Sequence, residues 1–405
     1  MRNLEKSVPV IRFKGFSEAW EQRKLGDIAN YRNGKAHEQV EDEDGKYTII
    51  NSKFISTNGK VQRYTNEQVE PIFDGEIAMV LSDLPNGKAL AKLFLVKEDG
   101  KYTLNQRIAG ITPNENIDPI FLNFRMNRNN YFLKFDSGVT QTNLSKSQVE
   151  NFIALYPTFD EQYKIGLFFT QLDDTIALHQ RKLDALKLMK KGFLQRMFPN
   201  NEEEIPKVRF ADFDGMWKQR KLNSITEKIT RKNKELESTL PLTISAQDGL
   251  IDQNEYFNKI IASRNIRGYF LVKNGEFAYN KSYSKGYPWG VVKRLDNYNM
   301  GVLSTLYIIF KPVKINSDFL TKYFDSTYWY RAVSQFATEG ARNHGLLNIA
   351  ASDFFEIELN IPLNNEEQKK IGLFFQQLEN IIILHQNKLE KLSILKKTYL
   401  KKMFI

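Results

Sequence analysis

The residue types that most often do chemistry are sparse in this chain and are not grouped as catalysis would need. The 405 residues include four histidines and no cysteine, so neither a thiolate zinc site nor a cysteine nucleophile can form. The Gly-Lys pairs, among them those at 34, 59, 87 and 100, lack the upstream glycine and the following Ser or Thr of a phosphate-binding loop. Asp83-Leu84-Pro85-Asn86 differs at two of four positions from the Asp-Pro-Pro-Tyr motif of amino-methyltransferases, and we interpret it as a turn. We therefore expect no active site, no metal and no cofactor in this chain itself.

The remaining candidates are loop residues with the chemistry of nucleic-acid binding. Lysine and serine can hold phosphates, whereas asparagine and arginine can read base edges through paired hydrogen bonds. Such residues occur at similar places in both halves of the chain, at 32–35 and 231–234, at 138–143 and 340–344, and in the basic, aromatic stretch 280–289. For any one position an ordinary surface loop is the alternative, and the paired placement favours binding. The residues that we predict to contact DNA are Arg32, Lys35, Thr140, Gln141, Asn143, Arg231, Lys232, Lys281, Tyr283, Lys285, Arg342 and Asn343.

Charge and composition are compatible with this interpretation. The chain carries a formal net charge of +10, which suits an anionic partner but also ordinary solubility. Apolar residues make up 41% and charged residues 26%, as in globular proteins. No apolar run approaches the roughly 20 residues that span a bilayer, and the N-terminal residues lack the apolar region of a secretion signal. Together with the absence of cysteine, these features predict a cytoplasmic protein.

Two segments of the chain occur twice. VPVIRFKGFSEAWEQRKLGDI at 8–28 returns as IPKVRFADFDGMWKQRKLNSI at 205–225, and we name these the leading segments. A longer block at 161–198 returns at 367–404 with 22 of 38 positions identical. The stretches between these blocks diverge. A repeated frame with different interiors predicts two related heads that recognise different things.

Each long block has the periodicity of an amphipathic helix. Its apolar positions alternate at spacings of four and three, the 3.5-residue period of a coiled coil, over a length of about 57 Å. We predict that the two helices pack antiparallel against each other, with pairing to another chain as the alternative. His179 and His385 lie on the seam, where we favour polar residues that fix the register over a metal site or pH switch. The other seam residues are Ile165, Phe169, Leu172, Ile176, Leu183 and Leu186, and in the second copy Ile371, Phe375, Leu378, Ile382, Leu389 and Leu392.

Short apolar runs punctuated by Gly, Asn and Asp predict mixed α/β heads. The expected fold class is therefore α/β, with two mixed heads that are each followed by a long helix, in a pseudo-two-fold repeat. The predicted boundaries are 1–159 for the first head, 160–204 for the first helix and linker, 205–362 for the second head and 363–405 for the second helix. Strands are predicted at 47–51, 77–81, 93–96, 108–112, 242–245, 277–279, 290–293 and 306–310, and helices at 119–128 and 317–329, the latter with Ser317 as N-cap.

With both blocks doubled in this order, the sequence resembles the specificity subunits of type I restriction–modification systems over nearly its whole length. The pattern P-x-x-RF-x-x-F-x-x-x-W-x-x-RKL occurs twice, as does E-Q-x-K-I-G-x-F-F-x-x-L-(D/E) at the helix starts. Gly-Glu-(Ile/Phe)-Ala at 75–78 and 275–278, with Pro157 and Pro362, completes the resemblance. It implies two target recognition domains that each read one half of a split DNA site, with the paired helices as the spacer between the halves.

The resemblance also implies partners. Two modification (methyltransferase) subunits would dock on the helices and leading segments, and restriction (translocase/nuclease) subunits would join them. S-adenosylmethionine, ATP and Mg²⁺ would belong to those partners, and Ile165–Phe169 and Ile371–Phe375 would be docking or seam residues. Two alternatives stay open from the residues alone. One is a coiled-coil scaffold whose heads bind proteins, and the other is an enzyme with a cryptic site.

Overall fold

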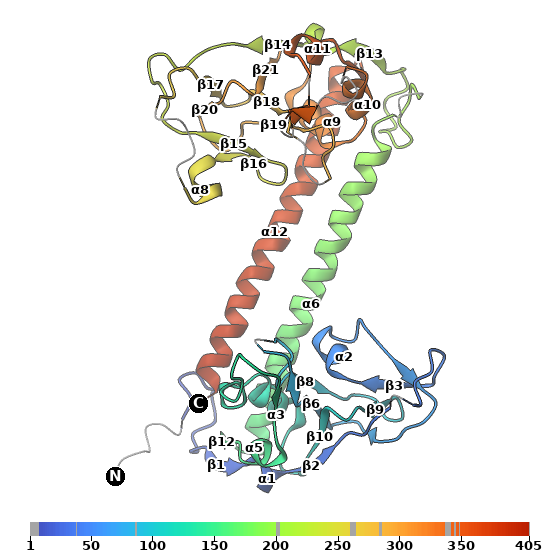
Figure 1. Cartoon of the computed structure of the whole chain (residues 1–405), viewed down its shortest axis with the longest axis vertical. Coiled ribbons are helices and arrows are strands. Elements are labelled where there is room, and N and C mark those ends of the chain that lie inside the picture. The colour runs from blue at the N-terminus through green and yellow to red at the C-terminus, as the bar shows by residue number, and fades with distance from the viewer. Residues whose placement is uncertain are drawn as a thin grey trace. The chain divides into compact units, whose positions relative to one another are not determined.

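The computed structural model describes residues 8–37, 39–85, 87–199, 203–259, 265–282, 286–336, 342–343, 346–347 and 349–404. The chain forms two units, of which the first combines Met1–Gln180 with Asn387–Ile405 and the second is Arg181–Gln386. Each unit holds one head and a part of both long helices, α6 (Phe159–Arg196) and α12 (Asn365–Met403) (Figure 1). Among the described residues, no helix is both long enough and apolar enough to cross a bilayer. The four domain boundaries drawn from the sequence stay a prediction.

The first head is built on an antiparallel sheet in the order β2-β10-β6-β8. Its inner strand β6 is buried on both faces. Ile77 and Met79 face a hydrophobic cluster that includes residues of the long helices, whereas Ala78 and Val80 face a second sheet. Successive side chains of a strand point to opposite faces, so an unbroken apolar run lets one strand serve two cores. The strands are β2 (Ala29–Asn33), β6 (Ile77–Val80), β8 (Leu93–Leu95) and β10 (Ile108–Pro113).

The second sheet of this head has the order β4-β3-β9-β5, and β3 and β9 run parallel. Its strands are β3 (Tyr47–Ile50), β4 (Tyr64–Thr65), β5 (Pro71–Ile72) and β9 (Tyr102–Leu104). Two further strand pairs are β1 (Glu21–Lys24) with β12 (Ile153–Tyr156), and β7 (Ser82–Asp83) with β11 (Thr142–Asn143). The short helices are α1 (Leu25–Ile28), α2 (Ser52–Ser56), α3 (Pro119–Met126), α4 (Asn130–Leu133) and α5 (Lys146–Glu150).

The second head repeats this frame. In the sheet β14-β21-β18-β19, Phe277 and Tyr279 of the central strand face the cluster that includes the helices, and Ala278 faces a second cluster. The strands are β13 (Lys218–Lys221), β14 (Thr226–Ile229), β15 (Leu242–Ser245), β16 (Gly249–Asp252), β17 (Phe270–Lys273), β18 (Phe277–Asn280), β19 (Val291–Arg294), β20 (Met300–Leu303), β21 (Ile308–Pro312), β22 (Arg342–Asn343), β23 (Leu346–Leu347) and β24 (Glu358–Ile361). The short helices are α7 (Leu222–Ile225), α8 (Gln253–Phe257), α9 (Ser317–Asp325), α10 (Trp329–Ser334) and α11 (Ala351–Glu356).

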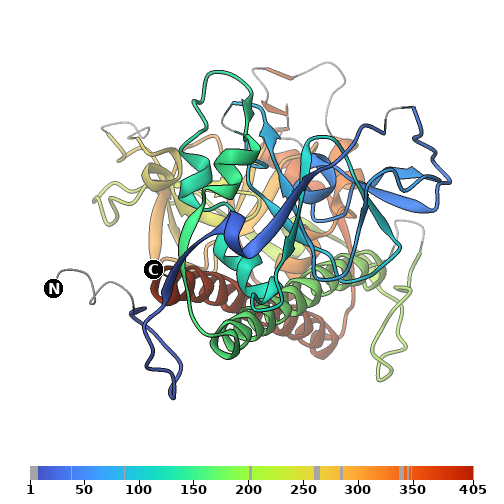
Figure 2. The same cartoon turned by 90° about the horizontal axis from the view of Figure 1, so that it is seen from below.

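The long helices pack antiparallel within each unit. In the first unit the rings of Phe168 and Tyr399 lie 5.2 Å apart, and Asp173, further along α6, meets Lys396, which comes earlier in α12. The second unit shows the same antiparallel order. Phe193 follows Lys190 along α6, whereas its partner Phe374 precedes Glu379, the partner of Lys190, along α12. The first leading segment also meets the end of α12, where the Ile11 amide donates to the Lys402 carbonyl at 3.1 Å (Figure 2). The predicted α/β class with paired antiparallel helices is confirmed.

Three local predictions were wrong. The helix expected at 317–329 is divided into α9 and α10, because Ser326 between them has extended backbone with ψ 173°. The N-cap of α9 is Asn316, whose side chain accepts a hydrogen bond from the Phe319 amide at 2.9 Å, and Ser317 is the first helical residue. The strand expected at 306–310 begins at Ile308.

Candidate nucleic-acid interface

A buried ion pair joins each leading segment to the start of a long helix. The Arg12 guanidinium donates from Nε and Nη2 to the two carboxylate oxygens of Glu161, both at 2.7 Å. Trp20 Nε1 donates to the same carboxylate at 3.3 Å, and the Glu161 side chain is fully buried. This arrangement, which we name the clamp, explains why Arg, Trp and Glu occur in both copies of the sequence. In the second copy Arg209 and Trp217 hold Glu367 in the same way.

The other repeated residues of the helix starts have structural roles too. Gln162 Nε2 donates to the Pro157 carbonyl at 2.9 Å, and Gln162 Oε1 accepts from the Asp118 amide just before α3 at 3.0 Å. Gly166 lies so close to α3 that a Cβ on it would come within 2.9 Å of the Asp118 carboxylate. Gln368 repeats these hydrogen bonds with Pro362 and Asn316. The repeated blocks therefore build a frame that fixes each head to its helix.

The frame extends into the heads through a second ion pair. Arg32 at the end of β2 donates from Nη1 and Nη2 to the Glu76 carboxylate at 2.7 and 2.6 Å. Burial alone would raise the pKa of Glu76, but the hydrogen bonds from Arg32 and Thr112 bring this pKa below its ordinary value. In the second head Arg231 Nη2 donates to Glu276 at 2.7 Å. The repeated Gly-Glu-(Ile/Phe)-Ala stretch thus supplies the partner of an arginine.

Four of the residues that we predicted to contact DNA have partners within their own head. Arg32 and Arg231 are each bound to a glutamate of their own head by charged hydrogen bonds, with about 29% and 33% of the side chain exposed, and their contact with DNA stays a prediction. Lys35 forms an ion pair with Glu70 at 3.1 Å, with more than half of its side chain exposed. The Lys232 ammonium lies 3.7 Å from the centre of the Phe270 ring, and burial lowers its pKa. Of these, Lys35 stays the most accessible to a ligand.

A different part of the first head gathers exposed polar residues from separate loops. Strand β7 directly follows the central strand β6 and pairs with β11, which brings Gln141 to Ser82 with Nε2 donating to Oγ at 2.6 Å. Thr140, Gln141 and Asn143 are all exposed there. Asp83 accepts hydrogen bonds from the amides of Ala89 and Leu90 and so holds the neighbouring loop in shape. The Asp83 segment is therefore a structural turn, as expected.

The second head brings the corresponding loops together. The Leu347 amide donates to the Lys281 carbonyl at 3.0 Å, just as the Leu144 amide donates to the Leu81 carbonyl at 2.9 Å in the first head. Strand β23, which pairs with β22 at Arg342–Asn343, therefore contacts the residue that directly follows β18. The Lys281 ammonium donates to the Ile349 carbonyl at 3.1 Å. Tyr283 and Lys285 lie outside the described residues, as do the side chains of Arg342 and Asn343 in β22.

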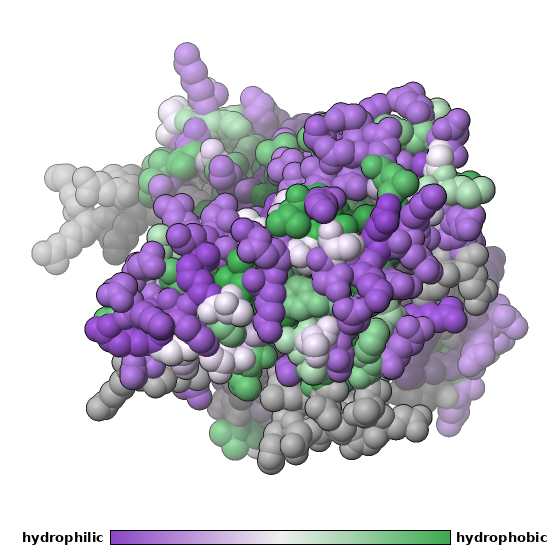
Figure 3. Space-filling view, turned by 90° about the horizontal axis from the view of Figure 1, so that it is seen from above, coloured by the Kyte–Doolittle hydropathy of each residue, from purple (hydrophilic) through white to green (hydrophobic). Residues whose placement is uncertain are grey.

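We name the paired loops at the end of each central strand the loop site of that head. In the first head they are 82–90 with 136–144, and in the second 281–290 with 342–347, as far as these are described. The sequence prediction missed two exposed cations, Lys88 in the first loop site and Arg107 beside it, whose carbonyl accepts a hydrogen bond from the Leu81 amide at 3.0 Å. The sequence could have indicated them, because both lie close to the ends of predicted strands, where the loops of a sheet come together. From above, the surface is largely hydrophilic with small apolar patches (Figure 3).

All of the predicted seam residues are buried or half-buried. Those nearest the start of each helix, Ile165 and Phe169 in the first copy, belong to the core of the first head, and Ile371 and Phe375 belong to the core of the second. The remaining buried ones are Leu172, Leu183, Leu378 and Ile382, and the half-buried ones are Ile176, Leu186, Leu389 and Leu392. In the part of the chain that is described, no group of three or more potential ligands among His, Cys, Asp and Glu could hold a metal ion.

Other helix positions are apolar although they face solvent. In the first unit these are Leu167 and Leu178 of α6 with Ile394 and Leu395 of α12, each at least 41% exposed. A shift of 206 residues along the sequence turns these positions into those of the second unit, which are Leu373, Leu384, Leu188 and Met189. Exposed apolar residues that recur at equivalent places are typical of a protein interface. We name each set a helix patch.

Comparisons with known proteins agree with one another. Residues 17–188 match the family model described as the type I restriction modification DNA specificity domain. The chain is 23% identical to the type I restriction enzyme MjaVIII specificity subunit of Methanocaldococcus jannaschii, over 94% of this chain and 91% of that protein. It is 24% identical to the putative type I restriction enzyme MjaX specificity subunit of the same organism, over 45% of this chain and 46% of that protein.

A solved structure shows the same fold over the whole chain. The crystal structure of the type I restriction–modification S subunit from M. genitalium is similar with a TM-score of 0.61 and 14% identity. The similarity covers 98% of this chain and 99% of that one. The family model matches the first copy of the repeat, and the second copy carries the same clamp, glycine and helix pattern. The chain is thus similar to type I restriction–modification specificity subunits, by the family model over residues 17–188 and by a curated relative over nearly its whole length.

Proposed function

We propose that this chain selects the DNA sequence on which a type I restriction–modification complex acts, with each head reading one half of a bipartite site. The observation that carries this proposal is the loop site, which both heads build at the end of the central strand on a shared frame. The frame residues are the same in the two heads, whereas the loop residues differ. Identical frames with different loops suit two different half-sites.

The loop sites have the chemistry for this role. Gln141 and Asn143 can read base edges through paired amide hydrogen bonds, and Lys88 and Arg107 can hold phosphates. In the second head the polar stretch that follows Asn280 occupies the corresponding place. We assign catalysis, and with it S-adenosylmethionine, ATP and Mg²⁺, to partner subunits. A DNA-modifying complex works where the chromosome is, so we propose the cytoplasm as its compartment.

The decisive experiment is to co-express the chain with its methyltransferase subunit and to map methylated bases across a genome. A bipartite motif is expected, and Gln141→Ala combined with Asn143→Ala should relax only one half of it. Lys53→Ala, at an exposed lysine on α2 of the same head, is the matched control and should leave the motif unchanged. The absence of a sequence motif from the wild-type map would refute the proposal and favour a scaffold whose heads bind proteins.

We propose that the helix patches dock two copies of the methyltransferase subunit. The same four positions are exposed and apolar in each unit, and a symmetric pair of surfaces suits two identical partners. Leu178→Glu should remove one copy of the partner and Leu384→Glu the other, with both lost in the double variant. Thr175→Glu introduces the same charge at an exposed polar position nearby and should leave both copies bound. Mass measurement of the purified complexes reads out the number of copies, and unchanged stoichiometry would refute this assignment.

We further propose that the helix pair sets the number of base pairs between the half-sites. Four residues inserted after Gln180 and after Gln386, which are equivalent positions, would lengthen each helix by about 6 Å. At about 3.4 Å per base pair, the preferred spacing should grow by one to two base pairs. Methylation maps of the variant would show this directly, and an unchanged spacing would count against the helices as a ruler.

A further inference from the structure

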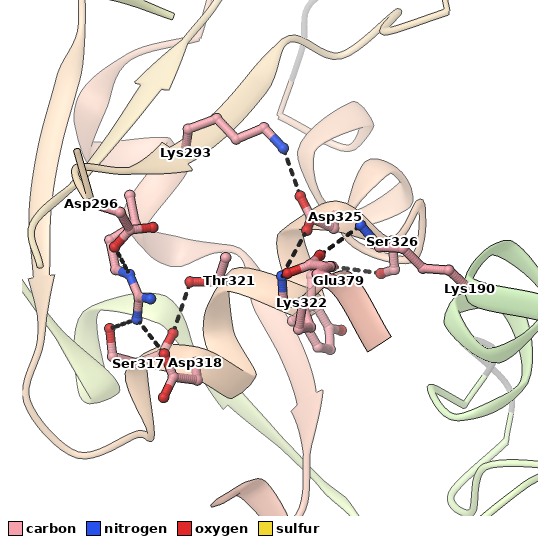
Figure 4. A network of polar contacts seen from close by, with 12 residues as sticks. Lys190, Lys293, Asp296, Ser317, Asp318, Thr321, Lys322, Asp325, Ser326 and Glu379 are labelled. Carbon is pink, nitrogen blue, oxygen red and sulfur yellow. Dashed lines mark hydrogen bonds and ion pairs between the residues drawn. The ribbon is translucent and has the colours of Figure 1, made fainter. Parts of the chain in front are cut away.

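A chain of ion pairs joins α9 of the second head to both long helices within the second unit (Figure 4). The Lys322 ammonium donates to both carboxylate oxygens of Glu379 on α12, each at 2.7 Å. Lys190 of α6 meets the same carboxylate at 2.6 Å. On the other side, Asp325 lies 3.5 Å from Lys322 and accepts a hydrogen bond from Lys293 of β19 at 2.6 Å. Five charges thus alternate in sign from the helices to the sheet of the head.

This network is largely shielded from water. The Lys322 side chain is 9% exposed and that of Asp325 15%. Burial alone would raise the pKa of Asp325 and Glu379, but the neighbouring lysine ammonium groups hold both pKa values below the ordinary range. The carboxylates therefore stay charged at neutral pH, and the pairs are directional contacts in a poorly screened environment.

The helix part of the network belongs to the repeated frame, but the head part does not. Lys190 and Glu379 correspond to Lys396 and Asp173, which also form an ion pair, at 2.7 Å in the first unit. The positions in the first head that align with Lys322, Asp325 and Lys293 are all uncharged. They are Phe124 and Asn127 in and after α3, and Phe94 in β8.

The first head uses aromatic packing and a cation–π contact at this place instead. The Phe124 ring lies 5.3 Å from that of Phe169, and the Lys396 ammonium lies 5.3 Å from the centre of the Phe124 ring. Apolar contacts depend on the area that is removed from water and tolerate small shifts, whereas hydrogen-bonded ion pairs demand a defined distance and angle. At equivalent places, the first head is thus held to the long helices by aromatic contacts and the second head by hydrogen-bonded ion pairs.

A groove of about 820 Å³ lies beside the ion pairs of the second unit. It is bounded by the turn between β15 and β16, by α9 and α10, and by both long helices, so it separates parts of the head from the helix pair. The ion pairs beside this unfilled space hold one side of the head, in addition to the clamp and the packed core that fix the head to α12. Lys322 is the only one of the five charged groups that touches carboxylates of both the helix pair and the head.

We propose that Lys322 is a positioning residue for DNA recognition, which fixes the angle of the second head on the helix pair and thereby the spacing at which the second half-site is accepted. This inference rests on the proposed function. Without the ammonium group, the head keeps its fold and its loop site but rocks about the groove. The complex then accepts half-sites at neighbouring spacings as well.

The test compares Lys322→Met, which keeps the length of the side chain, with Lys322→Arg, which keeps its charge. In the complex with the methyltransferase subunit, we expect Lys322→Met to lower the preference for the correct spacing over a spacing one base pair longer or shorter by at least about tenfold. Lys322→Arg should retain most of the preference for the correct spacing. Lys314→Met, at an exposed lysine just before α9 and outside the network, is the matched control and should leave the spacing preference unchanged.

Hydrogen exchange of the complex without DNA separates this inference from the proposed function. Amides of α9 should exchange faster in Lys322→Met, with α3 of the first head as the unaffected internal reference. Unchanged exchange in α9 would overturn the proposal, and so would faster exchange with an intact spacing preference, since Lys322 would then be only structural. If Lys322→Met does not fold, Lys293→Met removes the outer end of the network and should give a smaller effect in the same direction. A wild-type complex without a bipartite motif would instead refute the proposed function.

Discussion

The clamp allows a quantitative prediction about what holds each head to its helix. Replacing Glu161 by Met keeps a similar volume but leaves the Arg12 guanidinium and the Trp20 indole N–H without their acceptor. The Arg12 side chain is 11% exposed, so water can compensate only a small part of this loss. Removing one partner of a buried ion pair costs about 3–5 kcal/mol, because an uncompensated charge stays behind. The free energy of opening this part of the first unit should fall by that amount.

Removing both partners should cost much less. In Arg12→Met with Glu161→Met, no charge stays buried, and apolar side chains can fill the space, which is often close to neutral. The Trp20 N–H still lacks its acceptor, at a cost of about 1–3 kcal/mol. The difference between the double variant and the sum of the single ones measures the coupling of the pair.

Hydrogen exchange is the suitable assay because two units in one chain do not unfold as a single two-state system. Since about 1.4 kcal/mol corresponds to a factor of ten, amides around Arg12 should exchange about two to three and a half orders of magnitude faster in Glu161→Met. The equivalent peptides around Arg209 and Glu367 in the second unit are the internal control. An acceleration below about tenfold, or one that the double variant fails to reverse, would refute the reasoning about the clamp.

Two further predictions follow from the frame. A Cβ at Gly372 would come within 2.7 Å of the Asp318 Cβ, so Gly372→Ala should lower the free energy of unfolding by about 1–3 kcal/mol. Gly192→Ala in α6 meets no atom within 4 Å and should raise stability by up to about 1 kcal/mol, which thermal unfolding of the two variants can compare. The lowered pKa of Glu76 predicts stability that is present above the unfolded value near pH 4.3 and is lost as pH falls through the folded value. Urea unfolding of the first unit between pH 6 and 3 should therefore depend less on pH in Glu76→Gln, and equal slopes would refute an ionised Glu76–Arg32 pair.

The helices and the existence of two heads could be predicted from the sequence because they rest on periodicity and on duplication. A 3.5-residue apolar period over a long block has few structural alternatives. The strands β13 and β1 could not be predicted, since Lys218–Lys221 contains only charged and amide side chains and is exposed throughout. Backbone pairing with β24 forms this strand, and its partner lies far along the chain. Such a strand leaves no apolar pattern in the sequence.

The ion pairs of Arg32 and Arg231 with glutamates could have been anticipated from the sequence, while their contact with DNA stays a prediction. Each arginine occurs at an equivalent place in both heads, and so does the glutamate that binds it. Residues that are the same in two heads with different targets are better explained by the frame that the heads share. Gln141 has no identical counterpart in the second head, and it lies at the loop site.

The same comparison separates structural from recognition residues elsewhere in the molecule. Duplicated contacts include the clamp, the close-packed glycines and the ion pair between the long helices, and they serve what both halves share, which is to fix a head to its helix. Contacts that occur in only one half of the chain serve a property of that half alone. Lys322 is of this second kind although it touches neither loop site. It replaces an aromatic residue of the first head with a charge that binds a duplicated glutamate. A change confined to one head at its joint with a shared helix can alter where that head reads DNA without altering which bases it reads.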